Sequence, residues 1–93
     1  MRAITNVFVS KFAEKQLKKL PWNIKEALQY WVESVQLQGI RSVRRLPGYH
    51  DEPLKGDRKG QRSVRLNKSY RAIYIETLEG VEITVIEVNK HEF

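Results

Sequence analysis

Residues 46–75 gather side chains that could act on a phosphodiester. A polar loop punctuated by glycines runs into two segments of strand-like composition, and together they carry one histidine, one glutamate and several cations: His50, Glu52, Lys55, Arg62, Arg65 and Arg71. Imidazole titrates near neutral pH, and a guanidinium group presents a rigid fork that matches two phosphate oxygens. RNA is therefore the first partner to consider.

Cleavage of RNA by its own 2′-hydroxyl group makes three demands on a protein. One group must accept the hydroxyl proton, a second must protonate the leaving 5′-oxygen, and positive charge must surround the transition state. This chemistry requires no metal and no cofactor. The histidines of the chain are His50 and His91, and either could be the acid or the base. An exposed histidine is more often an ordinary surface residue, and the spacing of these two carries no signal, so the pattern alone favours a surface role over catalysis.

The arginines carry a stronger signal than the histidines. Arg62, Arg65 and Arg71 lie on or beside two adjacent expected strands, where their side chains could hold a phosphate together. The alternative is a solvated strand face on which Glu76 and Glu87 pair with these arginines.

The loop before these strands is also cationic. Lys55, Arg58 and Lys59 flank Gly56 and Gly60, so cations and backbone amides could approach an RNA backbone together. The spacing lacks the Gly-Lys-Ser/Thr ending of a Walker motif, and it does not predict a nucleotide site.

Several aromatic residues could stack on bases. Tyr49 and Tyr70 are expected at exposed positions suited to unpaired bases, whereas Tyr74 alternates with apolar neighbours and is expected in the core. Trp31 lies on the apolar stripe of an expected helix, and we assign it to the core as well.

The composition predicts one soluble domain over residues 1–93. Seventeen Lys and Arg against eleven Asp and Glu leave a formal charge of +6, which attracts polyanions but also serves ordinary solubility. The absence of cysteine excludes disulfides, and two histidines make a poor structural zinc site, so we expect a reducing cytoplasm and no bound metal. No stretch has the length of a membrane span or the pattern of a secretory signal, and we expect no membrane partner.

Hydrophobic periodicity predicts two helices after a short first strand. The apolar run at residues 7–9 is followed by Ser10, a favourable N-cap for a helix over residues 11–20 that Pro21 stops. A second amphipathic helix is expected from an N-cap at Asn23 to about Gly39.

The second half of the chain has the pattern of a sheet. Residues 40–61 form a long connection, with a short helix or strand expected near residues 44–46. Residues 62–66, 70–76 and 81–88 are rich in β-branched and aromatic types and are separated by turns, which predicts an antiparallel meander. We expect an α+β fold in which a helical hairpin packs on a twisted antiparallel sheet of about four strands. The first strand would lie beside the meander, and the arginines would occupy the opposite face.

The segment PLKGDRKGQRSVRLNKSYRAIY, placed after two helices and before a last strand ending in NKHEF, resembles the RelE/ParE toxin superfamily. It looks most like the HigB-type branch, and the resemblance covers nearly the whole chain. It implies a RelE-like toxin of a type II toxin–antitoxin system, a ribosome-dependent endoribonuclease that cuts mRNA in the A site without a metal. The implied partners are the ribosome, mRNA and a cognate antitoxin, which we expect to be a helix-turn-helix protein. The toxin would contact operator DNA only through this antitoxin.

The resemblance also implies roles for individual residues. Arg71 would neutralise the scissile phosphate with Arg65 beside it, and His91 would take part in proton transfer. Some HigB-like relatives place a histidine where this chain has Glu52, with His50 two residues earlier, so the partner of His91 is left open between these two. The residues expected to hold RNA are Lys55, Arg58, Lys59, Arg62, Lys90 and Tyr70.

A different function is compatible with the same resemblance. A ParE-like toxin would inhibit DNA gyrase by protein binding without cutting nucleic acid, and a decayed toxin would only bind its antitoxin. Fold alone cannot separate these functions. The basic strands and the C-terminal histidine favour the nuclease, because gyrase binding does not need them.

Overall fold

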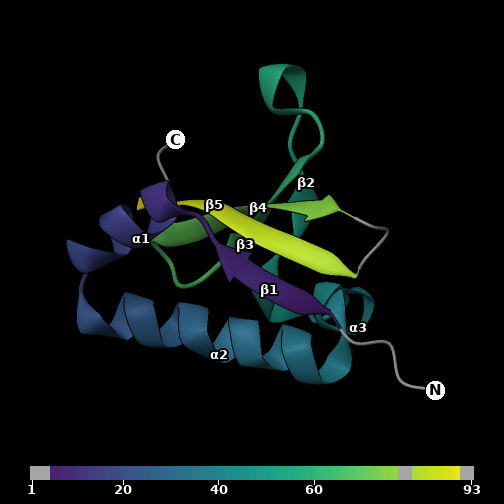
Figure 1. Ribbon diagram of the computed structural model, residues 1–93, viewed down its shortest axis with the longest axis horizontal. Coiled ribbons are helices and arrows are strands. Elements are labelled where there is room, and N and C mark those ends of the chain that lie inside the picture. The colour runs from purple at the N-terminus through teal and green to yellow at the C-terminus, as the bar shows by residue number, and fades with distance from the viewer. Residues whose placement is uncertain (1–4, 78–80, 91–93) are drawn as a thin grey trace.

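The computed structural model describes residues 5–77 and 81–90 of the 93. Within these residues three α-helices cover one face of a five-stranded sheet, and the other face is free of helices (Figure 1). The strand order is β1-β5-β4-β3-β2. None of the described helices is long and apolar enough to cross a membrane. The expected α+β architecture is therefore present, with one strand more than predicted.

The first strand lies beside the meander, as expected, but it changes the character of the sheet. β1 (Asn6–Val9) pairs in parallel with β5 (Glu82–Lys90), and Phe8 stands opposite Thr84. The helices connect β1 to the remaining strands, and such a crossover returns the chain in the same direction. The sheet is therefore mixed, and the prediction of a purely antiparallel sheet was wrong.

The first helix begins where the sequence predicts. α1 (Lys11–Lys18) follows Ser10, whose Oγ accepts a hydrogen bond from the amide of Ala13 at 3.1 Å. A serine in this position satisfies one of the free amides of the first turn. The helix ends two residues before the predicted boundary, ahead of Pro21.

The second helix starts earlier than predicted, and a third follows it. α2 (Trp22–Gln38) begins directly after Pro21, so Asn23 lies inside the helix and is not its N-cap. Gly39 then adopts a φ of 86°, which L side chains rarely adopt, and separates α2 from α3 (Ile40–Arg44). The amide of Ile40 donates to Thr5 Oγ1 at 3.2 Å, which ties this corner to the residue before β1.

The predicted meander is present, with a small extra strand at its edge. β3 (Gln61–Arg65), β4 (Tyr70–Thr77) and β5 agree with the predicted strands to within two residues. The side chain of Asn67 closes the first turn by accepting from the amides of Ser69 at 2.7 Å and Tyr70 at 2.8 Å. The second predicted turn, at residues 78–80, lies outside the described residues. β2 (Glu52–Pro53) pairs with β3 and was missed, because two residues carry no periodicity.

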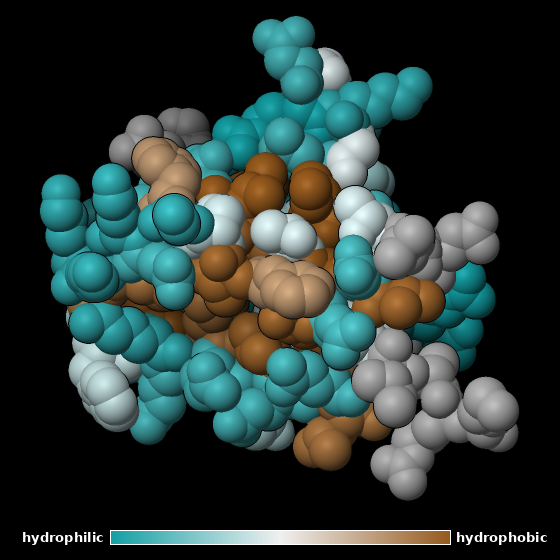
Figure 2. All heavy atoms as spheres, viewed as in Figure 1, coloured by the Kyte–Doolittle hydropathy of each residue, from teal (hydrophilic) through white to brown (hydrophobic). Residues whose placement is uncertain are grey.

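The core lies between the helices and one face of the sheet. Trp31 and Tyr74 are fully buried with ring centroids 5.3 Å apart, which confirms the prediction that both are core residues. Phe8 of β1 is 51% exposed, and Figure 2 shows apolar side chains gathered at the centre of the viewed face. Alternation along β4 sends Ala72 and Tyr74 to the core and Arg71 to the open face.

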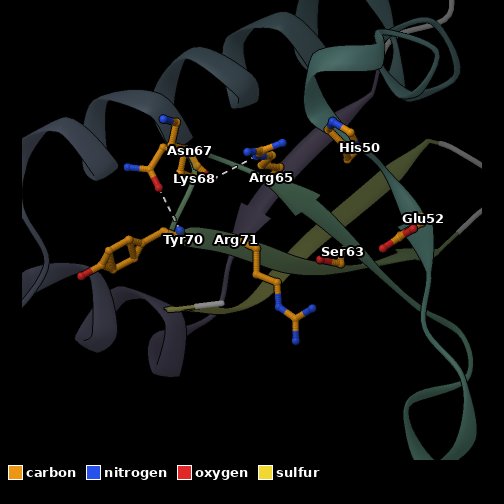
Figure 3. Close-up of a pocket in the computed structure, with 8 residues that line it drawn as sticks. All are labelled: His50, Glu52, Ser63, Arg65, Asn67, Lys68, Tyr70 and Arg71. Carbon is orange, nitrogen blue, oxygen red and sulfur yellow. Dashed lines mark hydrogen bonds between the residues drawn. The ribbon is translucent and has the colours of Figure 1, made fainter. Parts of the chain in front are cut away.

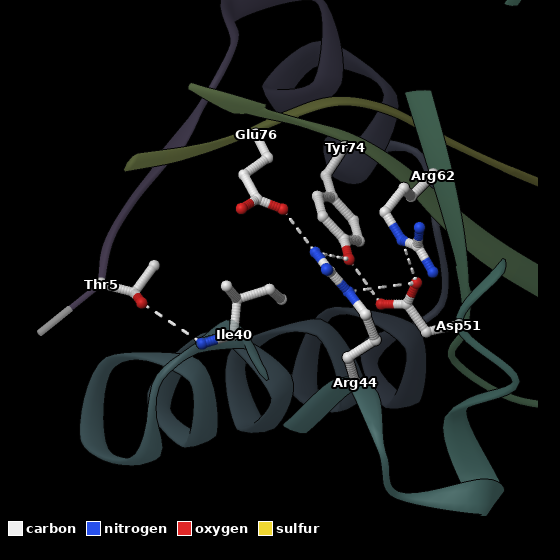
Figure 4. A network of polar contacts seen from close by, with 7 residues as sticks. All are labelled: Thr5, Ile40, Arg44, Asp51, Arg62, Tyr74 and Glu76. Atoms are coloured by element: carbon white, nitrogen blue, oxygen red, sulfur yellow. Dashed lines mark hydrogen bonds and ion pairs between the residues drawn. The ribbon is translucent and has the colours of Figure 1, made fainter. Parts of the chain in front are cut away.

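A buried carboxylate holds the connection before β2 against the sheet (Figure 4). The side chain of Asp51 is 1% exposed, and it accepts from Arg62 Nε at 2.7 Å and from the hydroxyl of Tyr74 at 2.5 Å. Arg44 donates to Glu76 Oε1 at 2.5 Å and to the Tyr74 hydroxyl at 3.2 Å. This network joins α3, β3 and β4 to the segment that enters β2.

Two members of this network, Tyr74 and Arg44, have raised pKa values. Burial raises the pKa of Tyr74, and its hydrogen bond to Asp51 raises it further, so the phenol stays neutral and donates its proton. Burial lowers the pKa of Arg44, but hydrogen bonds to Glu76 and Tyr74 outweigh this effect and the pKa rises. Arg44 therefore remains a cation.

We expect Asp51→Ala to lower the free energy of unfolding by about 2–4 kcal/mol, because it leaves Arg62 and Tyr74 without their shared acceptor. The matched control is Asp57→Ala, at an exposed carboxylate, which should change stability by less than about 0.5 kcal/mol. Urea denaturation followed by circular dichroism measures both. Equal stability of the two variants would show that the network does not support the fold.

Candidate functional site

A pocket of about 230 Å³ opens where β2, β3 and β4 meet (Figure 3). Four of the predicted catalytic residues line it together, although they come from a loop, a short strand and two strands of the meander. The lining residues are His50, Glu52, Ser63, Arg65, Asn67, Lys68, Tyr70 and Arg71.

The two pocket arginines occupy paired positions on neighbouring strands. Arg65 and Arg71 are directly opposed in the β3–β4 register. Arg65 Nε donates to the carbonyl of Asn67 at 3.3 Å, whereas Arg71 Nε is buried and makes no hydrogen bond within the described residues. Like charges opposed across two strands are destabilising, and a buried donor without a partner adds to this cost. An anion bound between the two guanidinium groups would offset both costs.

His50 reaches the pocket through an unusual backbone conformation. It follows the 3-10 turn η1 (Pro47–Tyr49), its φ and ψ are 45° and 46°, and its amide donates to the carbonyl of Pro47 at 3.2 Å. The left-handed conformation costs about 1 kcal/mol in a residue other than glycine. Such strain persists where the surrounding structure imposes it, and functional sites are common places for it.

Glu52 occupies the pocket because its neighbour Asp51 is buried. Adjacent residues of an extended chain point to opposite sides, so the inward position of Asp51 directs Glu52 outward, opposite Ser63. Figure 3 shows Ser63 between Glu52 and Arg71. Sequence reasoning did not identify Asp51, because its role depends on contacts with β3 and β4 that no local pattern reveals.

Arg62 does not share the face of the other two strand arginines. It lies on the helix-covered side and pairs with Asp51, so the expectation that all three occupy the open face was wrong for this residue. Residues 62 and 65 are three positions apart, and an odd separation places them on opposite faces of a regular strand. This pairing gives Arg62 a structural role.

The two glutamates considered as partners bind other arginines. Glu76 pairs with Arg44 at 2.5 Å, and Glu87 pairs with Arg58 at 2.6 Å. The alternative in which they neutralise the arginines of the pocket is therefore not what the described residues show. Arg65 and Arg71 have no carboxylate partner among them.

Of the other residues predicted to contact RNA, Tyr70 lines the pocket, and the lysines lie elsewhere on the described surface. Lys55 and Lys59 are exposed in the loop of residues 54–60, which extends beyond the edge of the sheet (Figure 1). Lys90 is exposed opposite Tyr70, a half-buried residue of the pocket wall. His91 lies outside the described residues.

The described groups suit anion binding and proton transfer. Two guanidinium groups supply positive charge, and an imidazole and a carboxyl group supply sites for a proton. Within the described residues, no group of three or more His, Cys, Asp or Glu side chains could hold a metal ion.

No family model and no curated protein matches the sequence. Solved structures do match its fold. YafQ from E. coli strain BL21(DE3) superposes with a TM-score of 0.75 at 17% identity, over 94% of this chain and 93% of YafQ. The YoeB/ParE toxin from Agrobacterium tumefaciens gives 0.65 at 21% identity, over 99% and 100% of the two chains.

A third similar structure is the toxin–antitoxin complex RelBE2 from Mycobacterium tuberculosis. Its TM-score is 0.62 at 23% identity, over 95% of this chain and 99% of the matched chain. The similarity extends over nearly the full length of all three proteins, so it concerns the whole arrangement of helices and sheet. The chain therefore has the same RelE-like fold as these toxin structures.

Proposed function

We propose that this protein is the toxin of a type II toxin–antitoxin system and, as a HigB-like member, a ribosome-dependent endoribonuclease that cleaves mRNA in the A site. The observation that carries the proposal is the pocket, which gathers Arg65, Arg71, His50 and Glu52 on one open face. The fold shared with RelE-like toxins supports the same function.

The arginine pair would bind the scissile phosphate. Arg71 would contact its non-bridging oxygens, and Arg65 would add charge from the facing strand. The phosphorane-like transition state carries more negative charge on these oxygens than the diester does. Two fixed guanidinium groups therefore stabilise it more than the ground state.

Acid–base groups would move the two protons. A base removes the 2′-hydroxyl proton, the 2′-oxygen attacks phosphorus, and the bond from phosphorus to the 5′-oxygen breaks as an acid protonates that oxygen. The products are a 2′,3′-cyclic phosphate and a free 5′-hydroxyl group. We assign one role to His91 and the other to Glu52 or His50, both of which line the pocket.

The partners follow from this function. A cognate antitoxin, of the helix-turn-helix class, would inhibit the toxin and would be its only connection to operator DNA. RelBE2, which shares the fold, is a toxin–antitoxin complex. The formal charge of +6 would favour binding to the ribosome and mRNA, and RNA would be contacted by the exposed Lys55, Lys59 and Lys90 and by Tyr70 of the pocket wall.

We expect Arg71→Ala to reduce mRNA cleavage on translating ribosomes by about 10²–10³-fold, because it removes a charge that acts on the transition state. Arg41→Ala, which removes the same charge from an exposed position on α3, should keep nearly full activity. Toeprinting or primer extension measures both. Full cleavage by Arg71→Ala would refute the mechanism, and inhibition of gyrase supercoiling without cleavage would establish the ParE-like alternative.

The pH dependence of single-turnover cleavage should identify the partner of His91. An acid and a base produce a bell-shaped profile, and removal of either group abolishes one limb. His91→Gln should keep only one limb of the pH–rate profile. We expect either His50→Gln or Glu52→Gln to lose that limb, and the other of these two variants to keep the full bell-shaped profile. Unchanged profiles in both variants would show that neither residue transfers the proton.

We also expect Arg65→Gln to raise the free energy of unfolding by about 0.5 kcal/mol in low salt, because it removes the charge opposite Arg71. Inorganic phosphate should raise the melting temperature of the wild type more than that of this variant. Thermal denaturation with and without phosphate measures both effects, with Arg41→Gln as control. A variant less stable than the wild type would contradict the assigned repulsion.

A further inference from the structure

An ion pair on the open face connects the loop of residues 54–60 with β5. Arg58 Nη2 lies 2.6 Å from Glu87 Oε1, and Arg58 Nε donates to Gln61 Oε1 at 2.8 Å. β4 separates β3 from β5 in the sheet, so the Arg58 side chain passes over β4 to reach its partner. Ile73, the residue of β4 opposite Glu87, is fully buried although it belongs to the open face.

The carboxylate also connects to the arginine pocket. Asn89 Nδ2 donates to Glu87 Oε2, and Asn89 stands directly opposite Arg71 in the β4–β5 register. The side chains of Arg58 and Glu87 are 41% and 22% exposed, so water and salt screen this pair less than one in free solution. Glu87 therefore connects the loop, through Arg58, with Asn89, the residue of β5 that is paired with Arg71.

The loop of residues 54–60 makes few other interactions with the sheet within the described residues. It is closed at its base by the amide of Leu54, which donates to the carbonyl of Gln61 at 2.9 Å, and it turns at Gly56 and Gly60, which have positive φ. Its lysines, Lys55 and Lys59, are exposed. The ion pair of Arg58 is the one that ties this loop to the sheet within the described residues.

We propose that Glu87 is a positioning residue that, through Arg58, holds the loop of residues 54–60 so that Lys55 and Lys59 bind the RNA backbone next to the phosphate held by Arg65 and Arg71. This inference rests on the proposed RNA function. A carboxylate on an RNA-binding face weakens binding by its charge alone. Its benefit there is geometric, because it converts a mobile pair of lysines into a fixed extension of the phosphate site.

The direction in which RNA affinity changes on neutralising Glu87 distinguishes a positioning role from an effect of charge alone. Glu87→Gln and Glu26→Gln, at an exposed position on α2, each raise the net charge by one. Charge alone predicts that both variants bind RNA slightly more tightly than the wild type. Positioning predicts that Glu87→Gln binds about threefold to tenfold more weakly, because the lysines lose their place, while Glu26→Gln does not weaken.

The probe is a short single-stranded 2′-O-methyl RNA, which cannot be cleaved, and fluorescence anisotropy at low salt measures its affinity. Arg58→Gln should weaken binding, and the double variant with Glu87→Gln should weaken it no further, since both changes release the same loop. Binding by Glu87→Gln that equals or exceeds that of the wild type would overturn the inference. Unchanged melting temperatures would show that the losses do not arise from unfolding.

Hydrogen exchange tests the positioning without RNA. In Glu87→Gln, the amides of Leu54, Arg58 and Lys59, all hydrogen-bonded in the wild type, should exchange several-fold faster while those of β4 are unchanged. Unchanged exchange in the loop would refute the positioning role. If the wild type neither binds the oligonucleotide nor cleaves mRNA, both the proposed function and the role of the loop in RNA binding are refuted. Faster loop exchange would then still establish that Glu87 positions the loop.

Discussion

The buried carboxylate of Asp51 is the interaction on which the candidate site depends. A carboxylate removed from water is stable only with partners, and Arg62 and the phenol of Tyr74 supply them from two strands of the sheet. Because Asp51 must point inward, the chain on either side of it has little freedom. Glu52 is directed outward, and His50 is held in a left-handed turn beside it. One internal constraint thus places the two residues that could be the proton-transfer partner of His91.

The arginine pair of the site, unlike Asp51, lacks an oppositely charged partner within the described part of the chain. Arg65 and Arg71 oppose each other without a carboxylate partner among the described residues, and Arg71 Nε is buried without an acceptor there. Interactions elsewhere must offset this cost, chiefly the packing of Trp31 and Tyr74 in the core and the Asp51 network. Stored repulsion of this kind is typical of a site built for an anionic ligand, because the ligand relieves it on binding.

Local patterns predicted most of the fold and part of the site. Ser10, the apolar stripe through Trp31 and the strands of the meander follow from capping and periodicity. β2 was not predicted, because a strand of two residues has no periodicity. The parallel pairing of β1 was not predicted either, because the direction of a strand depends on the path of the intervening helices. Five of the eight pocket residues were identified from the sequence by their chemistry. Asp51 and Glu87 were not assigned their roles, since each acts through a distant arginine.

The sequence by itself determined which segments form helices and strands, which residues are core, and that the surface is cationic, because these properties depend on neighbours a few positions away. The tertiary structure decided which cations belong to the site. Strand alternation separates Arg62 from Arg65, but only the folded chain pairs Arg62 with the buried Asp51 and leaves Arg65 at the pocket. Arg44 and Arg58, likewise, have partners about thirty positions away, at Glu76 and Glu87. The physical reason is that the partner of a charge is fixed by distance in space, and the packing of the sheet sets that distance.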